Sequence, residues 1–360
     1  MFEHNDRLPQ NRQPPPYLSS DLPDGTVDDQ PRQNRDGTAP NPDRNAGPAA
    51  GENSAAGDLQ SHNDSPHDPF HWSLTQGTPV GRALISAAQR LSDSGNELAR
   101  LDSQVLLAHV LRQNRSWLFA HHDHELSDRD CRRYADLITR RRRREPVAYL
   151  LGRKEFYGLE FAVDRRVLIP RPETELLIDL VLAQIGDRTG RPVVVADVGT
   201  GSGAIAITIA VHAPEAIVYG IDVSRDALDV AEMNKKHLTP EGGPLFLEGD
   251  LLSPLPEPAD IIVANLPYIA DEEYSGLQSD VRDYEPRLAL KAGAEGLDLI
   301  ERLLGQLSSR VQSGGAVLLE ISPRQGEVVQ EMAQQLRPKP SYVGLRRDYS
   351  GLVRMVTLEF

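Results

Sequence analysis

Cysteine is almost absent from this chain, which contains Cys131 alone among its 360 residues. A single cysteine excludes an intrachain disulfide and a multi-cysteine zinc site, and it fits a reducing compartment. The sequence also lacks an apolar run of about 18 residues that could span a bilayer, and it lacks the basic start and apolar core of a signal peptide. We therefore expect a cytoplasmic protein with no metal site and no membrane association.

Positive charge is scarce as well, because 39 Lys and Arg residues stand against 53 Asp and Glu residues, a net charge of −14. A chain with this balance is not expected to bind nucleic acid stably. Half of the excess lies in residues 1–78, where 12 Asp and Glu face 5 Arg, a difference of −7. This segment is rich in Pro, Asn, Asp and Gly and poor in large apolar residues, so we predict a disordered, solvated tail.

Residues 79–150 show helical periodicity and are predicted to form a small all-helical domain. Apolar residues recur at three- and four-residue spacing from Val80 to Leu91, and a second such segment runs from Leu101 to Val110 with Asp102 as its first-turn or capping acid. A third helix is predicted to begin near Ser127 and to bury Cys131.

The third helix ends in five consecutive arginines, residues 140–144. Basic residues at a helix C-terminus are favoured by the helix dipole, so the run is interpreted first as a solvated helix end. The alternative is a basic patch for RNA or an acidic partner. The sequence leaves both interpretations open.

Residues 151–168 are predicted to form a hairpin that links this domain to a second one, residues 169–360. The second domain starts with Ile-Pro-Arg-Pro-Glu-Thr-Glu at 169–175. Two prolines pin this stretch as an extended loop, and the acids after them belong to the first turn of a helix. Arg171 is held between the prolines, and we expect it to contact the substrate.

A glycine-rich turn follows a predicted buried strand at 193–197 and precedes an apolar helix at 204–211. Its sequence, Val-Gly-Thr-Gly-Ser-Gly at 198–203, allows close backbone approach to a ligand. Asp222 follows the next strand and is placed to accept the hydroxyls of a ribose. Asp250 is placed to reach an adenine amino group, and Leu251 to cover one face of the base.

The same glycines also satisfy a dinucleotide fingerprint, so NAD is a competing cofactor. Asp197 lies just before the turn, where it would repel a pyrophosphate but suit the cationic end of S-adenosylmethionine. The sequence therefore favours S-adenosylmethionine. The predicted cofactor-binding residues are Asp197, Gly199, Thr200, Gly201, Ser202, Gly203, Asp222, Asp250, Leu251 and Asn265.

A second corner follows the continuous β-branched run that ends before Asn265, where the sequence reads Asn-Leu-Pro-Tyr at 265–268. The run is typical of a parallel strand buried on both faces, and ligands bind at the carboxyl ends of such strands. The Asn265 amide oxygen and the Leu266 carbonyl could each accept an N–H from a planar nitrogen. Tyr268 would supply a flat surface, and Pro267 would keep the corner stiff.

Over residues 80–360 the chain resembles the release-factor glutamine N5-methyltransferases. The resemblance rests on residues 169–175, the turn at 197–204, the Asn-x-Pro-Tyr corner, Val-Arg-Asp-Tyr-Glu-Pro at 281–286 and Arg-Asp-Tyr-Ser-Gly at 347–351. It implies an α/β fold of class I S-adenosylmethionine-dependent methyltransferases, with a Rossmann-like seven-stranded sheet ending in an antiparallel hairpin. It also implies methylation of the glutamine in the Gly-Gly-Gln loop of peptide chain release factors.

In that resemblance the glycine turn, Asp222 and Leu251 correspond to cofactor contacts. The corresponding catalytic and substrate-binding positions are Asn265, Leu266, Pro267 and Tyr268. The chain departs from the family's Asn-Pro-Pro-Tyr at Leu266, which keeps the backbone carbonyl but loses the restriction on φ. The helical domain is expected to recognise the release factor, and the protein is expected to be a monomer.

Other functions remain open from sequence alone. An adenine N6-methyltransferase of DNA or RNA would use the same corner to orient an exocyclic amine, but no target-reading domain is recognisable. A non-enzyme that binds cofactor or release factor is a second alternative, because of Leu266. An NAD-dependent dehydrogenase is a third, although no catalytic His, Arg and Asp set accompanies the turn.

Overall fold

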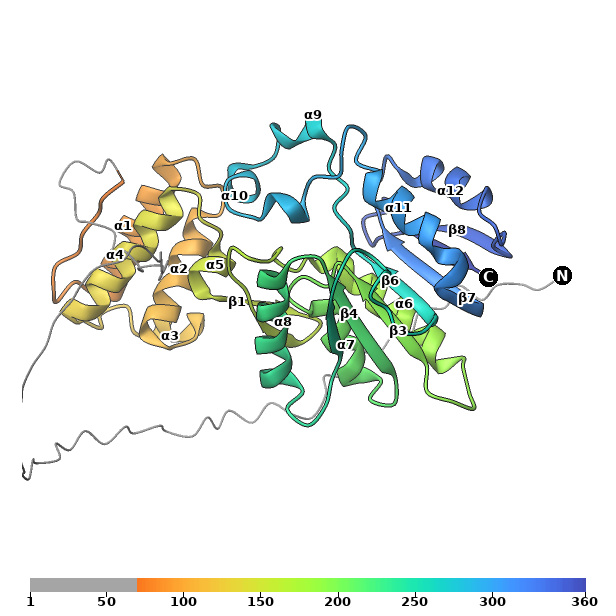
Figure 1. Ribbon diagram of the computed structural model, residues 1–360. Helices are drawn as coiled ribbons and strands as arrows, with labels where there is room; N and C mark the ends of the chain where they lie inside the picture. The colour runs from red at the N-terminus through yellow and green to blue at the C-terminus, as the bar shows by residue number, and fades with distance from the viewer. Residues whose placement is uncertain (1–69) are drawn as a thin grey trace, which may run out of the picture. The chain divides into compact units, whose positions relative to one another are not determined.

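The computed structural model describes residues 70–360, so the prediction of a disordered tail lies, for residues 1–69, outside the described part. The chain then forms a helical domain, a two-stranded hairpin and a seven-stranded sheet with its helices (Figure 1). None of the helices described is long and apolar enough to cross a membrane. Within the same residues, no group of three or more His, Cys, Asp or Glu side chains is arranged to hold a metal ion.

The helical domain was predicted from three periodic segments and contains five helices. Two short helices, α3 and α5, were missed because each is too short to show a period. The bounds are α1 Val80–Asp93, α2 Ala99–Leu111, α3 Arg115–Ala120, α4 Asp128–Arg142 and α5 Val147–Leu151. Ser127 caps α4 by accepting a hydrogen bond from the Asp130 amide, as its place before the apolar period predicts.

The boundary between tail and helical domain lies earlier than residue 78. Trp72 is only 6% exposed and packs edge-on against Tyr134, with ring centroids 5.8 Å apart, in the core of the helical domain. The Gly77 amide donates to the Leu126 carbonyl, and Pro79 bridges to Glu125. Residues 70–78 therefore belong to this domain. Their polar composition predicted a tail, although one of these residues, Trp72, is buried.

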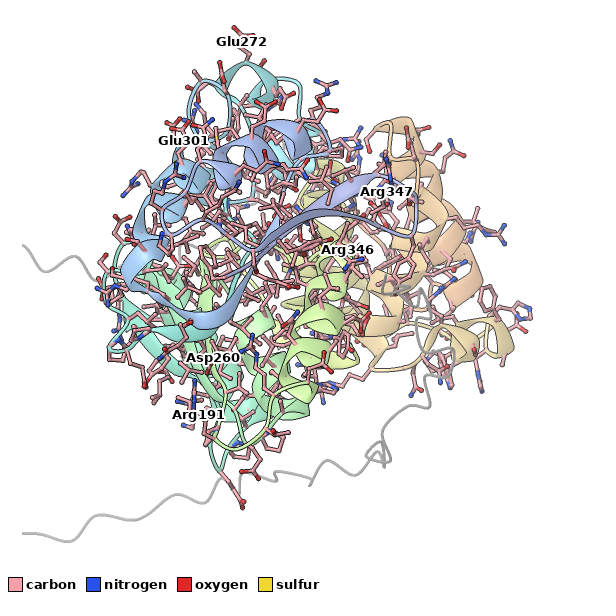
Figure 2. The ribbon with its side chains drawn as sticks, turned by 90° about the vertical axis from the view of Figure 1, so that its right-hand side faces the viewer. Arg191, Asp260, Glu272, Glu301, Arg346 and Arg347 are labelled. Atoms are coloured by element: carbon pink, nitrogen blue, oxygen red, sulfur yellow. The ribbon has the colours of Figure 1, made fainter. Side chains whose placement is uncertain are left out.

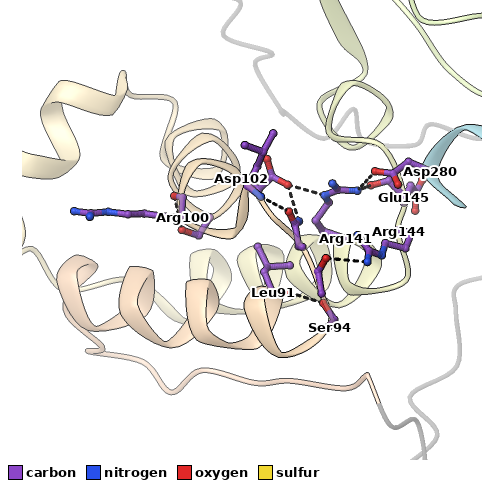
Figure 3. Close-up of polar contacts among 12 residues, drawn as sticks. Leu91, Ser94, Arg100, Asp102, Arg141, Arg144, Glu145 and Asp280 are labelled. Carbon is purple, nitrogen blue, oxygen red and sulfur yellow. Dashed lines mark hydrogen bonds and ion pairs between the residues drawn. The ribbon is translucent and has the colours of Figure 1, made fainter. Parts of the chain in front are cut away.

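The arginine run at 140–144 is not a fully solvated helix end, because only Arg143 of the five arginines is exposed. Arg141 is buried, and its Nε donates to Asp102 at 2.7 Å while its Nη1 donates to Asp280 at 2.9 Å (Figure 3). Arg140 pairs with Glu145 at 2.8 Å, and Arg144 donates to the Gly95 carbonyl. The run fixes the end of α4 to its surroundings, and Asp102 serves as an ion-pair partner as well as a first-turn acid.

A hairpin of β1 (Arg153–Phe156) and β2 (Leu159–Ala162) follows the helical domain, as predicted. The sheet has the order β5-β4-β3-β6-β7-β9-β8, with the last two strands antiparallel to their neighbours. This confirms the expected seven strands and closing hairpin. The bounds are β3 Val194–Val198, β4 Ile217–Asp222, β5 Leu245–Glu248, β6 Ala259–Ala264, β7 Val311–Glu320, β8 Tyr342–Arg347 and β9 Val353–Glu359.

Helices cover both faces of the sheet (Figure 1), which explains why its central strands are continuously apolar. One face packs against α11 and α12, and the other against α6 and α7. The helix bounds are α6 Glu175–Gly186, α7 Ala204–His212, α8 Arg225–Leu238, α9 Asp271–Tyr274, α10 Ser279–Arg282, α11 Asp298–Gln306 and α12 Gly326–Gln334, and the short 3-10 turns are η1 Pro172–Thr174, η2 Arg287–Ala289 and η3 Leu307–Ser309.

An ion pair fastens the amino end of the central strands. Both carboxylate oxygens of Asp260, at the start of β6, accept hydrogen bonds from Arg191 at 2.8 and 2.6 Å (Figure 2). Asp260 also accepts the Val194 amide at 2.9 Å. The carboxyl ends of β3 and β6 carry the glycine turn and the Asn265 corner, so this clamp sets the register of the two site-bearing strands from their opposite end.

Candidate active site

The cavity that most of the predicted site residues line, named the main cavity for that reason, opens at the carboxyl ends of β3, β4 and β6, where parallel sheets bind ligands. Its volume is about 270 Å³. The predicted residues that line it are Gly199, Gly201, Asp222, Asp250, Leu251, Asn265, Leu266 and Pro267. Sequence reasoning missed others: Leu168 and Ser224 flank predicted positions but carry no signal of their own, and Leu299 and Arg302 come from the distant helix α11.

The glycine turn is held by hydrogen bonds from its own backbone amides. The amides of Gly199 and Thr200 both donate to the Ile221 carbonyl, at 2.8 and 2.9 Å. The Gly201 amide donates to Asp222 at 2.9 Å. Three successive amides are therefore already satisfied, so this stretch does not offer them to a pyrophosphate in the way a dinucleotide turn does. This disfavours NAD.

Gly199 has a second reason to be glycine. Its φ is +76°, a left-handed conformation that other residues rarely adopt, and a Cβ there would lie 3.1 Å from Cδ2 of Leu266. The Leu266 side chain is itself buried in the sheet core. The two predicted motifs, one after β3 and one after β6, are thus in direct contact.

Asp222 ends β4 and faces the main cavity. One of its oxygens accepts the Gly201 amide and the other accepts the Ser224 amide, each at 2.9 Å. A carboxylate has about four acceptor positions, so it retains capacity for a ligand. Burial raises the pKa of Asp222, although the amides of Ser224 and Gly201 favour its ionised form. These features match a carboxylate that accepts hydroxyl groups.

Four predicted cofactor residues do not line the main cavity: Asp197, Thr200, Ser202 and Gly203. Asp197 is fully buried behind the turn, where it accepts the Thr200 hydroxyl at 2.6 Å and the Ala206 amide at 3.1 Å. A Cβ on Gly203 would meet Ile207, Phe246 and Ala231 at 2.9 to 3.2 Å. The side chains of Asp197, Thr200 and Ser202 are buried inside the protein, where they hold the turn in shape, and the packing leaves no room for a side chain at Gly203.

Asp197 keeps one orphaned oxygen. Its Oδ1 is buried and has no hydrogen-bond partner within the described chain. Burial raises the pKa of this carboxyl group to about 7, against the stabilising bonds from Thr200 and Ala206. An unpaired buried acceptor next to the cavity fits a cationic ligand nearby better than an anionic one.

Asp250 and Leu251 form one edge of the main cavity. Leu251 has a φ of +50° and is only 7% exposed, which places its side chain in the wall. Asp250 forms an ion pair with Arg302 of α11. Its carboxylate is half exposed, so it retains acceptor positions for a base amino group while Arg302 holds it in place.

A smaller cavity of about 90 Å³ adjoins the corner. Arg171, Asn265, Leu266, Pro267 and Tyr268 all line it, together with Val281. Asn265, Leu266 and Pro267 line both cavities, so the corner lies where they meet. Burial raises the pKa of Tyr268 to about 12, and its ring therefore stays neutral.

Arg171 is fixed by a partner that the sequence did not identify. Its guanidinium pairs with Glu285, whose other oxygen accepts the Ile169 amide at 3.1 Å. Glu285 lies within the Glu-Pro of the 281–286 motif. Two motifs that are far apart in sequence thus form one wall, and Arg171 serves this wall as well as facing the smaller cavity.

Fold and site together define a methyltransferase of the class I type. A family model described as "Methyltransferase small domain" matches residues 173–280, and one described as "PrmC N-terminal domain" matches residues 82–152. The second match supports the helical domain as a unit that accompanies the catalytic one.

Curated relatives extend the match over most of both partners. The release factor glutamine methyltransferase of Clostridium acetobutylicum is 36% identical over 279 residues, covering 76% of this chain and 96% of that protein. The protein of the same name from Bordetella pertussis is 39% identical and covers 74% and 96%. A solved ribosomal protein L11 methylase from Lactobacillus delbrueckii is 23% identical, with a TM-score of 0.36 and coverage of 52% and 78%. The chain belongs to the release factor glutamine methyltransferase family.

Proposed function

We propose that this protein transfers a methyl group from S-adenosylmethionine to the side-chain amide nitrogen of the glutamine in the Gly-Gly-Gln loop of peptide chain release factors. The observation that supports the proposal is the position of Asn265, a residue that lines both the main cavity and the smaller one. Family membership supports the same reaction over the adenine N6-methyltransferase and dehydrogenase alternatives.

The main cavity would hold the cofactor. Asp222 would accept the ribose hydroxyls through its remaining acceptor capacity, and Leu251 and Asp250 would contact the adenine. Gly199 and Gly201 leave room beside the turn. When bound, S-adenosylmethionine supplies an electrophilic methyl group on a positively charged sulfur.

The corner would hold the substrate amide. An amide nitrogen is a poor nucleophile because its lone pair is shared with the carbonyl. The Asn265 side-chain oxygen and the Leu266 carbonyl would each accept one N–H, fixing the nitrogen in the orientation for attack and stabilising the positive charge that develops on it. Tyr268 would supply a face for the flat amide group, and Arg171 would contact the substrate from the opposite wall.

Leu266 replaces a proline of the family pattern without removing the acceptor. Its side chain is 4% exposed and packs in the sheet core, so packing restricts the corner where proline would restrict it covalently. We expect Leu266→Pro to be neutral or mildly activating. This position therefore does not favour a non-enzyme.

The helical domain would recognise the release factor, the protein would act as a monomer in the cytoplasm, where translation ends, and it would not bind nucleic acid stably. The net charge of −14 is consistent with the last point.

Substitutions of Asn265 test the function. Asn265→Ala should lower kcat by about 10²–10³-fold, by analogy with the loss of one oxyanion-hole donor but with the charge reversed, while cofactor affinity stays nearly unchanged. Asn265→Asp keeps an acceptor and should retain residual activity, whereas Asn265→Leu should be inactive. Kinetics with purified release factor and calorimetry with cofactor separate the two effects. Wild-type turnover by Asn265→Leu would remove the corner from the mechanism.

A further inference from the structure

Three side chains from three separate elements form a hydrogen-bonded chain behind the corner. Asn265 follows β6, Glu320 ends β7 and Thr174 ends η1. Strands β6 and β7 are parallel neighbours with Ala264 opposite Leu319, so the residues that follow these two lie side by side. The Asn265 Nδ2 donates to the Thr174 hydroxyl at 3.0 Å, and that hydroxyl donates to Glu320 Oε2 at 2.7 Å.

The direction of these bonds fixes the side-chain amide of Asn265. A hydroxyl has one proton, and Thr174 gives it to the carboxylate, so Thr174 can only accept from its other neighbour. The Thr174 oxygen therefore accepts a hydrogen bond from the NH₂ group of Asn265, and it would repel the amide oxygen if the amide were flipped. Asn265 Oδ1 accepts no hydrogen bond within residues 70–360, which leaves that oxygen for a ligand at the corner.

From this geometry we infer that Thr174 and Glu320 are positioning residues for methyl transfer, holding the Asn265 amide with its oxygen toward the substrate nitrogen. The inference rests on the proposed function for the identity of that nitrogen. Neither residue lines the main cavity or the smaller one. Their contribution is to exclude the flipped amide, which would present an N–H donor to a nitrogen that needs an acceptor.

Glu320 must be ionised for this arrangement. A protonated carboxyl group could donate to Thr174 and free the hydroxyl proton to meet the Asn265 oxygen, which would allow the flip. Glu320 is 2% exposed. Burial raises its pKa to about 7, while Thr174, Arg354 of β9 and Asn265 favour the ionised form and Glu173 opposes it. Tyr268 also lies within electrostatic range of Glu320, and Arg354 is shared with Asp348 at 3.1 Å.

A matched pair of Thr174 variants isolates the hydroxyl group. Thr174→Val removes the hydroxyl at nearly constant shape and should lower kcat on the order of 10²-fold, the cost of a misplaced reacting group, with cofactor affinity unchanged. Thr174→Ser keeps the hydroxyl and should stay close to wild type. Wild-type kcat should fall as the pH drops below about 7, and Glu320→Gln should lose that dependence.

A second readout does not depend on activity. The ¹⁵N side-chain amide signal of Asn265, identified by its loss in Asn265→Asp, should be a protected pair in the wild type and should exchange faster in Thr174→Val. Equal protection in both proteins, or a Thr174→Ser variant as slow as Thr174→Val, overturns the inference. A wild-type enzyme that leaves release factor unmethylated overturns the proposed function instead, and the amide signal still decides the orientation.

Discussion

Replacing Arg141 with alanine should destabilise the protein far more than replacing any exposed arginine of α4. The Arg141 guanidinium is 8% exposed and donates to Asp102, to Asp280 and, at 3.1 Å, to the Glu145 carbonyl (Figure 3). Asp102 is 7% exposed and also accepts from Asn96 at 2.8 Å. The alanine variant would leave that buried carboxylate without its cation.

Removal of one partner from a buried ion pair costs about 3–5 kcal/mol. At roughly 2–4 °C per kcal/mol for a chain of this size class, the melting temperature should fall on the order of 10 °C. Arg141→Lys should be intermediate, because an ammonium cannot reproduce the planar fork that meets both carboxylates and the carbonyl.

Arg132→Ala is the matched control, since it lies on the same helix and forms an exposed pair with Asp128 four residues away. Such a pair contributes only about 0.3–0.5 kcal/mol. Scanning calorimetry at pH 7 compares the variants. Because Asp280 precedes Val281, which lines the smaller cavity, Arg141→Ala should also raise the KM for release factor without changing cofactor affinity. A melting temperature equal to that of Arg132→Ala would refute the reasoning.

Three further outcomes are expected. Asp222→Ala should weaken cofactor binding by about 1.5–3 kcal/mol, the value of a hydrogen bond to a charged group; calorimetry measures it, and unchanged affinity would mean that the glycine turn holds something else. Trp72→Ala should lower the free energy of unfolding by about 3–5 kcal/mol. Deletion of residues 1–78 should lower the melting temperature whereas deletion of residues 1–69 should not, and equal effects of the two deletions would mean that residues 70–78 belong to the tail. Burial raises the pKa of folded Asp197 to about 7, so between about pH 4 and 7 the folded state binds more protons than the unfolded one, and stability falls as the pH rises from about 4 to 7. Asp197→Asn should flatten that part of a profile of melting temperature against pH, and an unchanged slope would assign the pH dependence to other groups.

Much of the sheet could be predicted because its signals are local. Continuous β-branched residues marked β3 and β6, and glycines marked the turn, so Asp222 and Asn265 were placed correctly at strand ends. The inward orientation of Thr200 and Ser202 could not be predicted, since it depends on what packs behind the turn. The predicted helix from residue 173 begins as η1 and continues as α6.

Contacts between residues that are far apart in the sequence could not be predicted either. Thr174 and Glu285 lie inside the motifs at 169–175 and 281–286, yet nothing in the local sequence indicates that Thr174 contacts Glu320 and that Glu285 contacts Arg171. The arginine run looked like a surface feature because five like charges normally are, and only the fold brings Asp102 and Asp280 to Arg141. A buried charge is visible in sequence only once its partner is known.

Tandem mass spectrometry of purified peptide chain release factor tests the central claim most directly. The release factor is incubated with this protein and S-adenosylmethionine carrying an isotopically labelled methyl group, with Asn265→Leu as the control. We expect one labelled methyl group on the glutamine side chain of the Gly-Gly-Gln peptide with this protein and none with the control. A label on any other residue, equal labelling by the control, or no label on release factor would contradict it.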